Sequence, residues 1–163
     1  MKIAITGHSA GIGQALAHIY EEHGHEVIGL SRRNGYNIRS IPKVANMIEP
    51  CDIFINNAQV GFAQTELLFE IWRRWEGQQK TIVNISTQMT GVLLPSKREW
   101  DEYIIQKKAL ELAGELLVHR NEWPKQIMIK PGNIATQPGQ TPPLYKDVTE
   151  YAQEVYEWIV KNT

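Results

Sequence analysis

Cysteine is nearly absent from this chain of 163 residues. Cys51 is the only one, so the sequence can form neither an intrachain disulfide nor a cysteine-based metal site. A single thiol is typical of proteins in a reducing compartment, and we expect a cytoplasmic protein. No run of signal-peptide length follows Lys2, and none approaches the ~20 apolar residues of a membrane helix. We therefore expect no membrane partner.

The chain also has no large excess of positive or negative charge. The formal net charge is −1, and Lys and Arg occur in runs no longer than a pair. This balance argues against nucleic acid as a partner. The five histidines lack the spacing of metal ligands, so we expect no metal site. The length and an apolar fraction of 42% predict a single domain over residues 1–163, with one sizeable core.

Short apolar runs alternate with segments of helical periodicity. Runs rich in Ile and Val predict strands that are covered on both faces, at 2–6, 26–31, 52–56, 81–86 and 126–130. Apolar residues at helical spacing predict helices around 12–20, 65–76, 109–116 and 148–160. We expect a short third strand at 34–38 and a short helix at 40–48, with Pro42 in its first turn. The pattern predicts the α/β class: a Rossmann-type doubly wound parallel sheet of about six strands with helices on both faces.

Three glycines lie between the first strand and the first helix. Gly7, Gly11 and Gly13 would let backbone N–H groups and the helix N-terminus approach a phosphate closely. No Gly-Lys-Ser or Gly-Lys-Thr follows, which excludes a triphosphate loop. The alternative is a glycine-rich turn that binds nothing.

Four motifs in one order resemble the short-chain dehydrogenase/reductase family. They are Thr6-Gly7-x-x-x-Gly11-Ile12-Gly13, Asn56-Asn57-Ala58, Tyr103-x-x-x-Lys107 and Pro131-Gly132-x-x-x-Thr136. The resemblance covers nearly the whole chain and implies a nicotinamide dinucleotide cofactor. It implies cofactor contacts from Thr6, Gly7, Ser9, Gly11, Ile12, Gly13, Ser31, Arg32, Arg33, Asn57, Ala58, Tyr103, Lys107, Pro131, Gly132, Ile134 and Thr136.

The Tyr103 and Lys107 pair carries the expected catalytic chemistry. Positions i and i+4 share one face of a helix, and a cation one turn away favours the phenolate. We therefore expect Lys107 to lower the pKa of Tyr103. The resemblance implies that Tyr103 transfers a proton and that Lys107 also holds the nicotinamide ribose. The alternative is a half-buried tyrosine beside a solvated lysine.

The resemblance implies that a hydroxyl at the end of the fifth predicted strand, 81–86, holds the substrate oxygen. Ser86 and Thr87 both qualify, but strand periodicity points them to opposite sides, so one of them acts. Alignment with the family's pattern favours Thr87. Trp100 is near enough to Tyr103 to line the substrate pocket, which we expect between segments 88–100 and 136–145.

The chain departs from the family's pattern in several places. Gln59 stands where the family has a glycine, and we expect it to crowd the cofactor. The stretch from Asn57 to Thr87 has room for one helix, and we find no counterpart of the family's catalytic asparagine. The chain also ends before the family's last strand. We expect a shortened member that forms a homodimer through Trp72 and Trp75.

Arg32 and Arg33 follow the second predicted strand, where a carboxylate would favour NAD. An arginine pair suits the 2′-phosphate of NADP, although a solvated basic turn is the alternative. We expect an NADP(H)-dependent oxidoreductase that interconverts a small-molecule carbonyl and alcohol. Two alternatives are a non-catalytic NADP-binding or sensor protein and a nucleotide-sugar epimerase or reductase.

Overall fold

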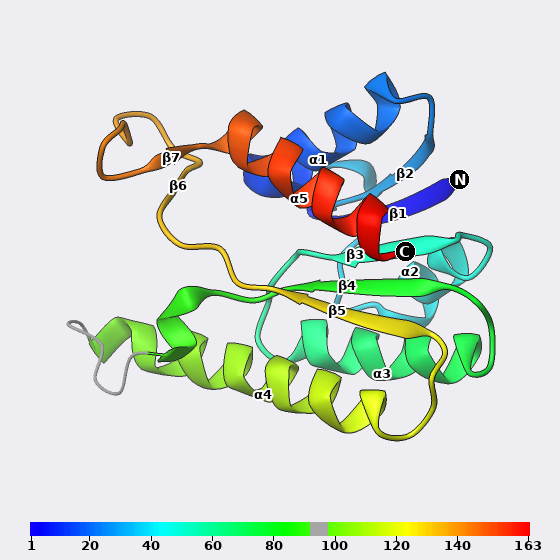
Figure 1. Ribbon diagram of the computed structural model, residues 1–163. Coiled ribbons are helices and arrows are strands. Elements are labelled where there is room, and N and C mark those ends of the chain that lie inside the picture. The colour runs from blue at the N-terminus through cyan, green and yellow to red at the C-terminus, as the bar shows by residue number, and fades with distance from the viewer. Residues whose placement is uncertain (92–97) are drawn as a thin grey trace.

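The computed structural model describes residues 1–91 and 98–163. Its centre is a parallel sheet of five strands in the order β2-β1-β3-β4-β5 (Figure 1). The strands are β1 (Lys2–Thr6), β2 (Glu26–Leu30), β3 (Ile53–Asn56), β4 (Thr81–Ile85) and β5 (Lys125–Ile129). The predicted α/β class and the Rossmann-type arrangement are confirmed.

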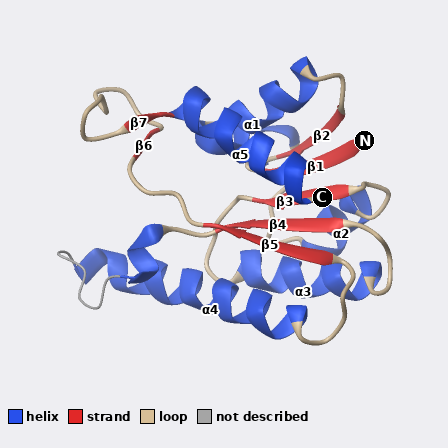
Figure 2. Ribbon diagram, in the orientation of Figure 1, coloured by secondary structure: helices blue, strands red, loops and turns tan. Residues whose placement is uncertain are grey.

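Helices cover both faces of the sheet (Figure 2). They are α1 (Gly11–Glu22), α2 (Ile41–Ile48), α3 (Ala63–Trp75), α4 (Asp101–Val118) and α5 (Val148–Asn162). Alternate strand residues point to opposite faces, so Phe54 and Ile82 pack toward α2, α3 and α4, whereas Ile55 and Val83 pack toward α1 and α5. This double burial explains why the strands read as continuous apolar runs.

The expected third strand at 34–38 is wrong. Residues Arg32–Asn34 form a short 3₁₀ turn, and Gly35 follows with φ +86° in the left-handed region. The Asn34 side chain accepts a hydrogen bond from the Ser31 backbone N–H at 2.8 Å and donates one to the Gly29 carbonyl at 2.7 Å. These local bonds turn the chain away from the sheet. Pro42 does lie in the first turn of α2, as predicted.

A second, separate pairing joins β6 (Ile134–Ala135) to β7 (Lys146–Asp147). Each of these strands has two residues, so within the described chain the main sheet has five strands where about six were predicted. The Asp147 side chain accepts hydrogen bonds from the backbone N–H groups of Thr149 and Glu150, which caps the N-terminus of α5.

The strand order places the functional loops. Strand β1 pairs with both β2 and β3, so the chain changes direction across the sheet at the carboxyl end of β1. Ligands bind at such a switch point in open α/β sheets, because the loops there diverge. The loops after β1, β2, β3, β4 and β5 all leave from this edge. Among the described helices, none combines the length and apolarity of a membrane span.

Trp72 and Trp75 are part of the core. Trp72 is 9% exposed and Trp75 is fully buried, where its Nε1 donates to the Glu49 carbonyl at 3.1 Å. The predicted dimer interface through these two side chains is therefore wrong. Their helical spacing turns both rings inward, because α3 packs against the sheet along that face.

We expect Trp75→Ala to lower the free energy of unfolding by about 3–5 kcal/mol, because it removes a buried ring and leaves a cavity. The measurement is urea unfolding followed by circular dichroism. Trp158→Ala is the matched control, since Trp158 is 45% exposed. Equal losses in the two variants would contradict the placement of Trp75 in the core.

Candidate functional site

The glycine turn after β1 depends on missing side chains. Gly7 and Gly11 have φ +73° and +55°, in the left-handed region that glycine adopts most readily. A Cβ on Gly13 would lie 2.5 Å from the Gly7 carbonyl oxygen, which no real contact allows. Helix α1 begins at Gly11, and its N-cap residue Ala10 provides no side-chain bond. The N–H groups of the first turn can therefore bind an anion.

Thr6 and Asn57 tie the glycine turn to the loop after β3. The Thr6 Oγ1 accepts hydrogen bonds from the backbone N–H groups of Asn57 at 3.0 Å and Ala58 at 3.1 Å. The Asn57 Nδ2 donates to the Thr6 carbonyl at 2.9 Å. These bonds hold the two loops of the switch point side by side. The shape of the turn therefore depends on Thr6, Asn57, Gly11 and Gly13.

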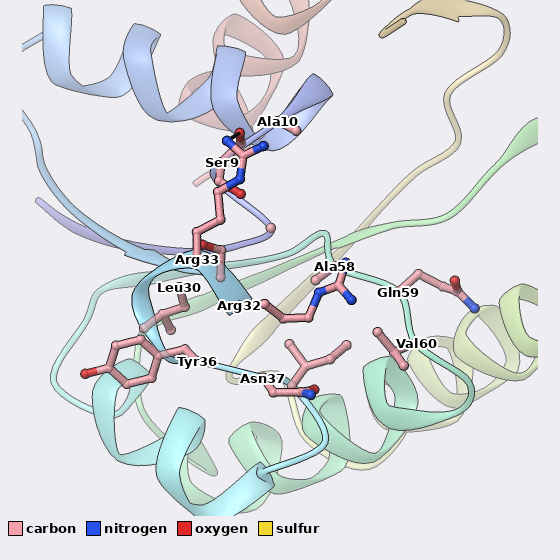
Figure 3. A pocket seen from close by; sticks show the side chains of 13 residues that line it. Ser9, Ala10, Leu30, Arg32, Arg33, Tyr36, Asn37, Ala58, Gln59 and Val60 are labelled. Atoms are coloured by element: carbon pink, nitrogen blue, oxygen red, sulfur yellow. Dashed lines mark hydrogen bonds between the residues drawn. The ribbon is translucent and has the colours of Figure 1, made fainter.

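A hollow of about 260 Å³, which we call the arginine hollow, lies beside the glycine turn (Figure 3). Arg33 points toward the turn and donates to the Ser9 carbonyl at 3.3 Å, while Arg32 extends toward Ala58. Among the described residues that line it, none carries a carboxylate. The lining residues are Gly7, Ser9, Ala10, Leu30, Ser31, Arg32, Arg33, Tyr36, Asn37, Ile38, Ala58, Gln59 and Val60.

A second hollow of about 240 Å³, the tyrosine hollow, lies at the ends of β4 and β5. It gathers every residue that the sequence predicted to be catalytic and many of those predicted to bind a cofactor. Its lining residues are Ile12, Asn57, Gln59, Ile85, Ser86, Thr87, Tyr103, Lys107, Pro131, Gly132, Ile134 and Thr136.

The Tyr103 phenol and the Thr87 hydroxyl line the same hollow and lie near enough to interact. Burial raises the pKa of Tyr103 above its usual value, and the interaction with Thr87 opposes this only in part. The expected lowering by Lys107 is wrong. The Lys107 Nζ lies 5.8 Å from the centroid of the Tyr103 ring, and the loss of water around the phenol sets the direction of the pKa shift.

Lys107 is 3% exposed. Its Nζ donates to the Ile85 carbonyl at 2.7 Å and to the Gln64 Oε1 at 2.9 Å. Burial lowers the pKa of Lys107 to about 8, and the charge of Glu111 opposes this fall. Gln64 lies in the first turn of α3, and sequence reasoning missed it. It belongs to no motif, and its burial is the property that distinguishes it.

Ser86 and Thr87 have different partners, as the strand periodicity predicted. The Ser86 Oγ donates to the Glu111 Oε1 at 2.5 Å, which turns it toward the body of α4. Glu111 also accepts from Thr90 at 2.8 Å and from Lys130 at 2.6 Å. Burial acts to raise the pKa of Glu111, but these hydrogen bonds hold it below its usual value. Thr87 is therefore the hydroxyl beside Tyr103.

Gln59 borders both hollows. Its side chain points away from Arg32 in Figure 3, and its amide donates a hydrogen bond to the Gln106 side chain of α4. The residue that replaces the family's glycine thus joins the loop after β3 to the helix that carries Tyr103 and Lys107.

A third hollow of about 350 Å³ adjoins the tyrosine hollow at Thr87 and Gly132. Gln88, Met89 and Asn133 also line it. The centroids of the Trp100 and Tyr103 rings lie 5.9 Å apart, and the rings are arranged edge-on. The predicted proximity of Trp100 to Tyr103 is therefore confirmed. Of the predicted substrate segment 88–100, residues 92–97 lie outside the described part of the chain.

Comparison with known proteins identifies the family. Residues 3–88 match the model of the NAD dependent epimerase/dehydratase family, whereas no curated protein matches the chain. An alcohol dehydrogenase from the archaeon Thermococcus sibiricus, complexed with 5-hydroxy-NADP, is similar in structure. Its TM-score is 0.72 at 16% identity, over 97% of this chain and 89% of that one.

Two further solved structures have the same fold. A 4-hydroxyisoleucine dehydrogenase complexed with NADH has a TM-score of 0.75 at 18% identity, over 97% of this chain and 90% of that one. A short chain dehydrogenase from Burkholderia cenocepacia J2315, in complex with NADP, has a TM-score of 0.74 at 19% identity. The alignment covers 97% of this chain and 83% of that one. The family model spans more than half of the 163 residues, and the protein therefore belongs to the NAD-dependent epimerase/dehydratase family.

Proposed function

We propose that this protein is an NADP(H)-dependent oxidoreductase that interconverts a carbonyl and an alcohol on a small molecule. The observation that carries the proposal is the group formed by Tyr103, Thr87 and Lys107 beside the glycine turn. Binding the adenine half of a dinucleotide requires neither the phenol nor the ammonium group, so their presence on one helix face favours an enzyme. Cys51 is buried and is a free thiol, which is compatible with the reducing environment of the cytoplasm.

The two hollows fit the two halves of a dinucleotide. The glycine turn and the start of α1 would hold the pyrophosphate, since Gly13 has no space for a side chain. Ser31, Arg32 and Arg33 would hold the adenosine half in the arginine hollow. The tyrosine hollow would hold the nicotinamide half against Lys107 and residues 131–136. When bound, the nicotinamide supplies or accepts the hydride.

Tyr103 would act as the general acid in reduction. Its raised pKa keeps the phenol protonated at neutral pH, so the hydroxyl can donate its proton to the substrate oxygen. Thr87 would hold the same oxygen by a hydrogen bond. The Lys107 ammonium group would stabilise the phenolate that forms. Ser86 is bonded to Glu111 and would steady the loop that carries Thr87.

The solved structures named above include complexes with NADP and with NADH, so they leave the choice of cofactor open. Our choice of NADP rests on the arginine hollow. A 2′-phosphate would lie near two guanidinium groups and meet no carboxylate among the described lining residues.

A nucleotide-sugar epimerase or reductase is the second candidate function. The match to the epimerase/dehydratase model favours it, but that match covers residues 3–88, which are the cofactor-binding half. The Tyr103 and Lys107 pair serves either reaction. Turnover of a uridine diphosphate sugar in place of simple carbonyls would establish this second function.

We expect NADPH to bind more tightly than NADH, and Arg32→Glu to weaken NADPH about tenfold or more. A charged hydrogen bond contributes roughly 1.5–3 kcal/mol, and solvent reduces this for an exposed arginine. The measurement is titration followed by nicotinamide fluorescence. Arg39→Glu is the matched control, because Arg39 is exposed nearby but does not line the arginine hollow. Equal wild-type affinity for NADPH and NADH would overturn the choice of NADP.

We expect Tyr103→Phe to reduce turnover of an aromatic aldehyde by roughly 10²- to 10⁴-fold, the share of general acid catalysis. Affinity for NADPH should persist, because one oxygen atom is lost from the wall of the hollow. Tyr151→Phe is the control, since Tyr151 is half-buried on α5. If Tyr103→Phe turns over every tested carbonyl at the wild-type rate, the non-catalytic NADP-binding or sensor protein becomes the better reading.

We also propose a homodimer, formed through α4. Its outer face exposes an apolar stripe of Ile105, Leu112 and Leu116, which are 58%, 57% and 52% exposed. With the half-buried Ala109, these residues follow the spacing of a helix-pairing seam. In an antiparallel pair with its axis between residues 110 and 111, Ile105 would face Leu116 and Ala109 would face Leu112.

The charges at the two ends of α4 fit the same pairing. In this alignment Asp101 would face Arg120 of the second copy, and Glu102 would face His119. All four residues are exposed. A parallel pair would bring the two acidic ends together, so the charges favour the antiparallel arrangement.

We expect Leu112→Glu to convert a dimer to a monomer in light scattering. Leu144→Glu is the control, because Leu144 is 75% exposed and far from α4 in the chain. Asp101→Arg should weaken the dimer, and adding Arg120→Asp should restore it. A wild-type monomer at high concentration would contradict the proposal.

A further inference from the structure

Gln64 is a buried glutamine with a partner on both sides of its amide. Its Nε2 donates to the Asn56 carbonyl at 2.6 Å and to the Ile85 carbonyl at 3.1 Å. Its Oε1 accepts from the Lys107 Nζ at 2.9 Å. Rotating the amide by 180° would place Oε1 against two carbonyl oxygens and the NH₂ group against an ammonium group. The orientation of Gln64 is therefore determined by its surroundings.

The neighbouring side-chain amides hold the backbone at Gln64 in place. The Asn56 Nδ2 donates to the Gln64 backbone carbonyl and to the Asn84 Oδ1, each at 3.0 Å. The Asn84 Nδ2 in turn donates to the Gln126 Oε1 at 3.3 Å. This row of side-chain amides crosses β3, β4 and β5. Asn56, Asn84 and Gln64 are at most 2% exposed, so water cannot substitute for these bonds.

Lys107 is therefore held by neutral acceptors. Gln64 and the Ile85 carbonyl take two of its three N–H donors, which leaves one for the tyrosine hollow that Lys107 lines. Glu111, one turn along α4, is the acidic group whose charge acts on it. The Glu111 oxygens are bonded to Ser86, Thr90 and Lys130. Among the described residues no carboxylate is hydrogen-bonded to the Lys107 Nζ, which lies 5.8 Å from the centroid of the Tyr103 ring.

We propose that Gln64 is the positioning residue of this site: it holds the Lys107 ammonium group beside Tyr103 through a neutral acceptor. The proposal rests on the proposed function, because Lys107 acts there on the phenol and on the cofactor. A carboxylate at position 64 would hold the ammonium group more strongly but cancel much of the charge that stabilises the phenolate. An apolar side chain would leave the ammonium group with one acceptor.

Two variants of similar size should therefore have opposite effects on the titration of Lys107. Gln64→Glu adds a negative charge and should raise its pKa by at least about one unit. Gln64→Met removes the acceptor and should lower it further. Turnover depends on the ammonium form, so the wild-type rate should fall as the pH rises through about 8. That fall should move to higher pH in Gln64→Glu and to lower pH in Gln64→Met.

The experiment follows the Lys107 side chain by NMR in protein with isotopically labelled lysine, and uses Lys107→Met to assign the signal. The pH dependence of aldehyde reduction and the affinity for NADPH are measured on the same proteins. We expect maximal turnover at least tenfold below wild type in both Gln64 variants. Gln153→Glu is the control for an added charge, since Gln153 is only half-buried on α5 and bonded to Glu157; its Lys107 titration should match wild type.

An unchanged Lys107 titration in folded Gln64→Met, or in folded Gln64→Glu whose new carboxyl is ionised by its own NMR signal, would overturn the positioning role, whatever the activity. The carboxyl signal is needed because its second oxygen would face the Asn56 and Ile85 carbonyls, to which only a protonated carboxyl donates. A titration that moves as expected in a protein that reduces no carbonyl would support the role of Gln64 and refute the proposed reaction. A wild type that reduces carbonyls while its variants keep the same titration and pH profile would refute the role alone.

Discussion

A buried ammonium group requires acceptors, and the site is arranged around this requirement. An unpaired charge in the interior costs several kcal/mol, on the order of the whole stability of a small domain. Lys107 therefore draws together the end of β4, through the Ile85 carbonyl, and the first turn of α3, through Gln64. Tyr103 lies one turn before Lys107 on α4, and Glu111 one turn after it. Satisfying a single charge thus positions three elements of the site.

The two halves of the cleft are built in different ways. The glycine turn is made of backbone, and its shape depends on the contact between Gly13 and the Gly7 carbonyl. The tyrosine hollow is made of side chains from α4 and from the loops after β4 and β5. Gln59 lies where the halves meet and reaches Gln106 on α4. In the proposed function the glycine turn holds the pyrophosphate, whereas the tyrosine hollow meets both the nicotinamide and the substrate.

Patterns along the chain predicted the features that depend on local sequence. The five strands of the main sheet, the glycine turn and the shared face of Tyr103 and Lys107 follow from spacing and residue type. The strand at 34–38 was wrong because the bonds of Asn34 to Ser31 and Gly29 turn the chain there. Apolar periodicity on α3 marked Trp72 and Trp75 but could not tell a core from an interface, since both require apolar surface.

The sequence by itself determined the fold class, the order of the elements and the residues gathered at the carboxyl edge of the sheet. It could do so because hydrophobic period and glycine position act over a few residues. Only the tertiary structure decided the electrostatics. The pKa of Tyr103 is raised, against expectation, because burial outweighs the interaction with Thr87. Gln64 meets Lys107 across 43 positions of sequence, since parallel strands bring distant segments to one edge. Desolvation and long-range contact belong to the folded chain, and no local pattern records them.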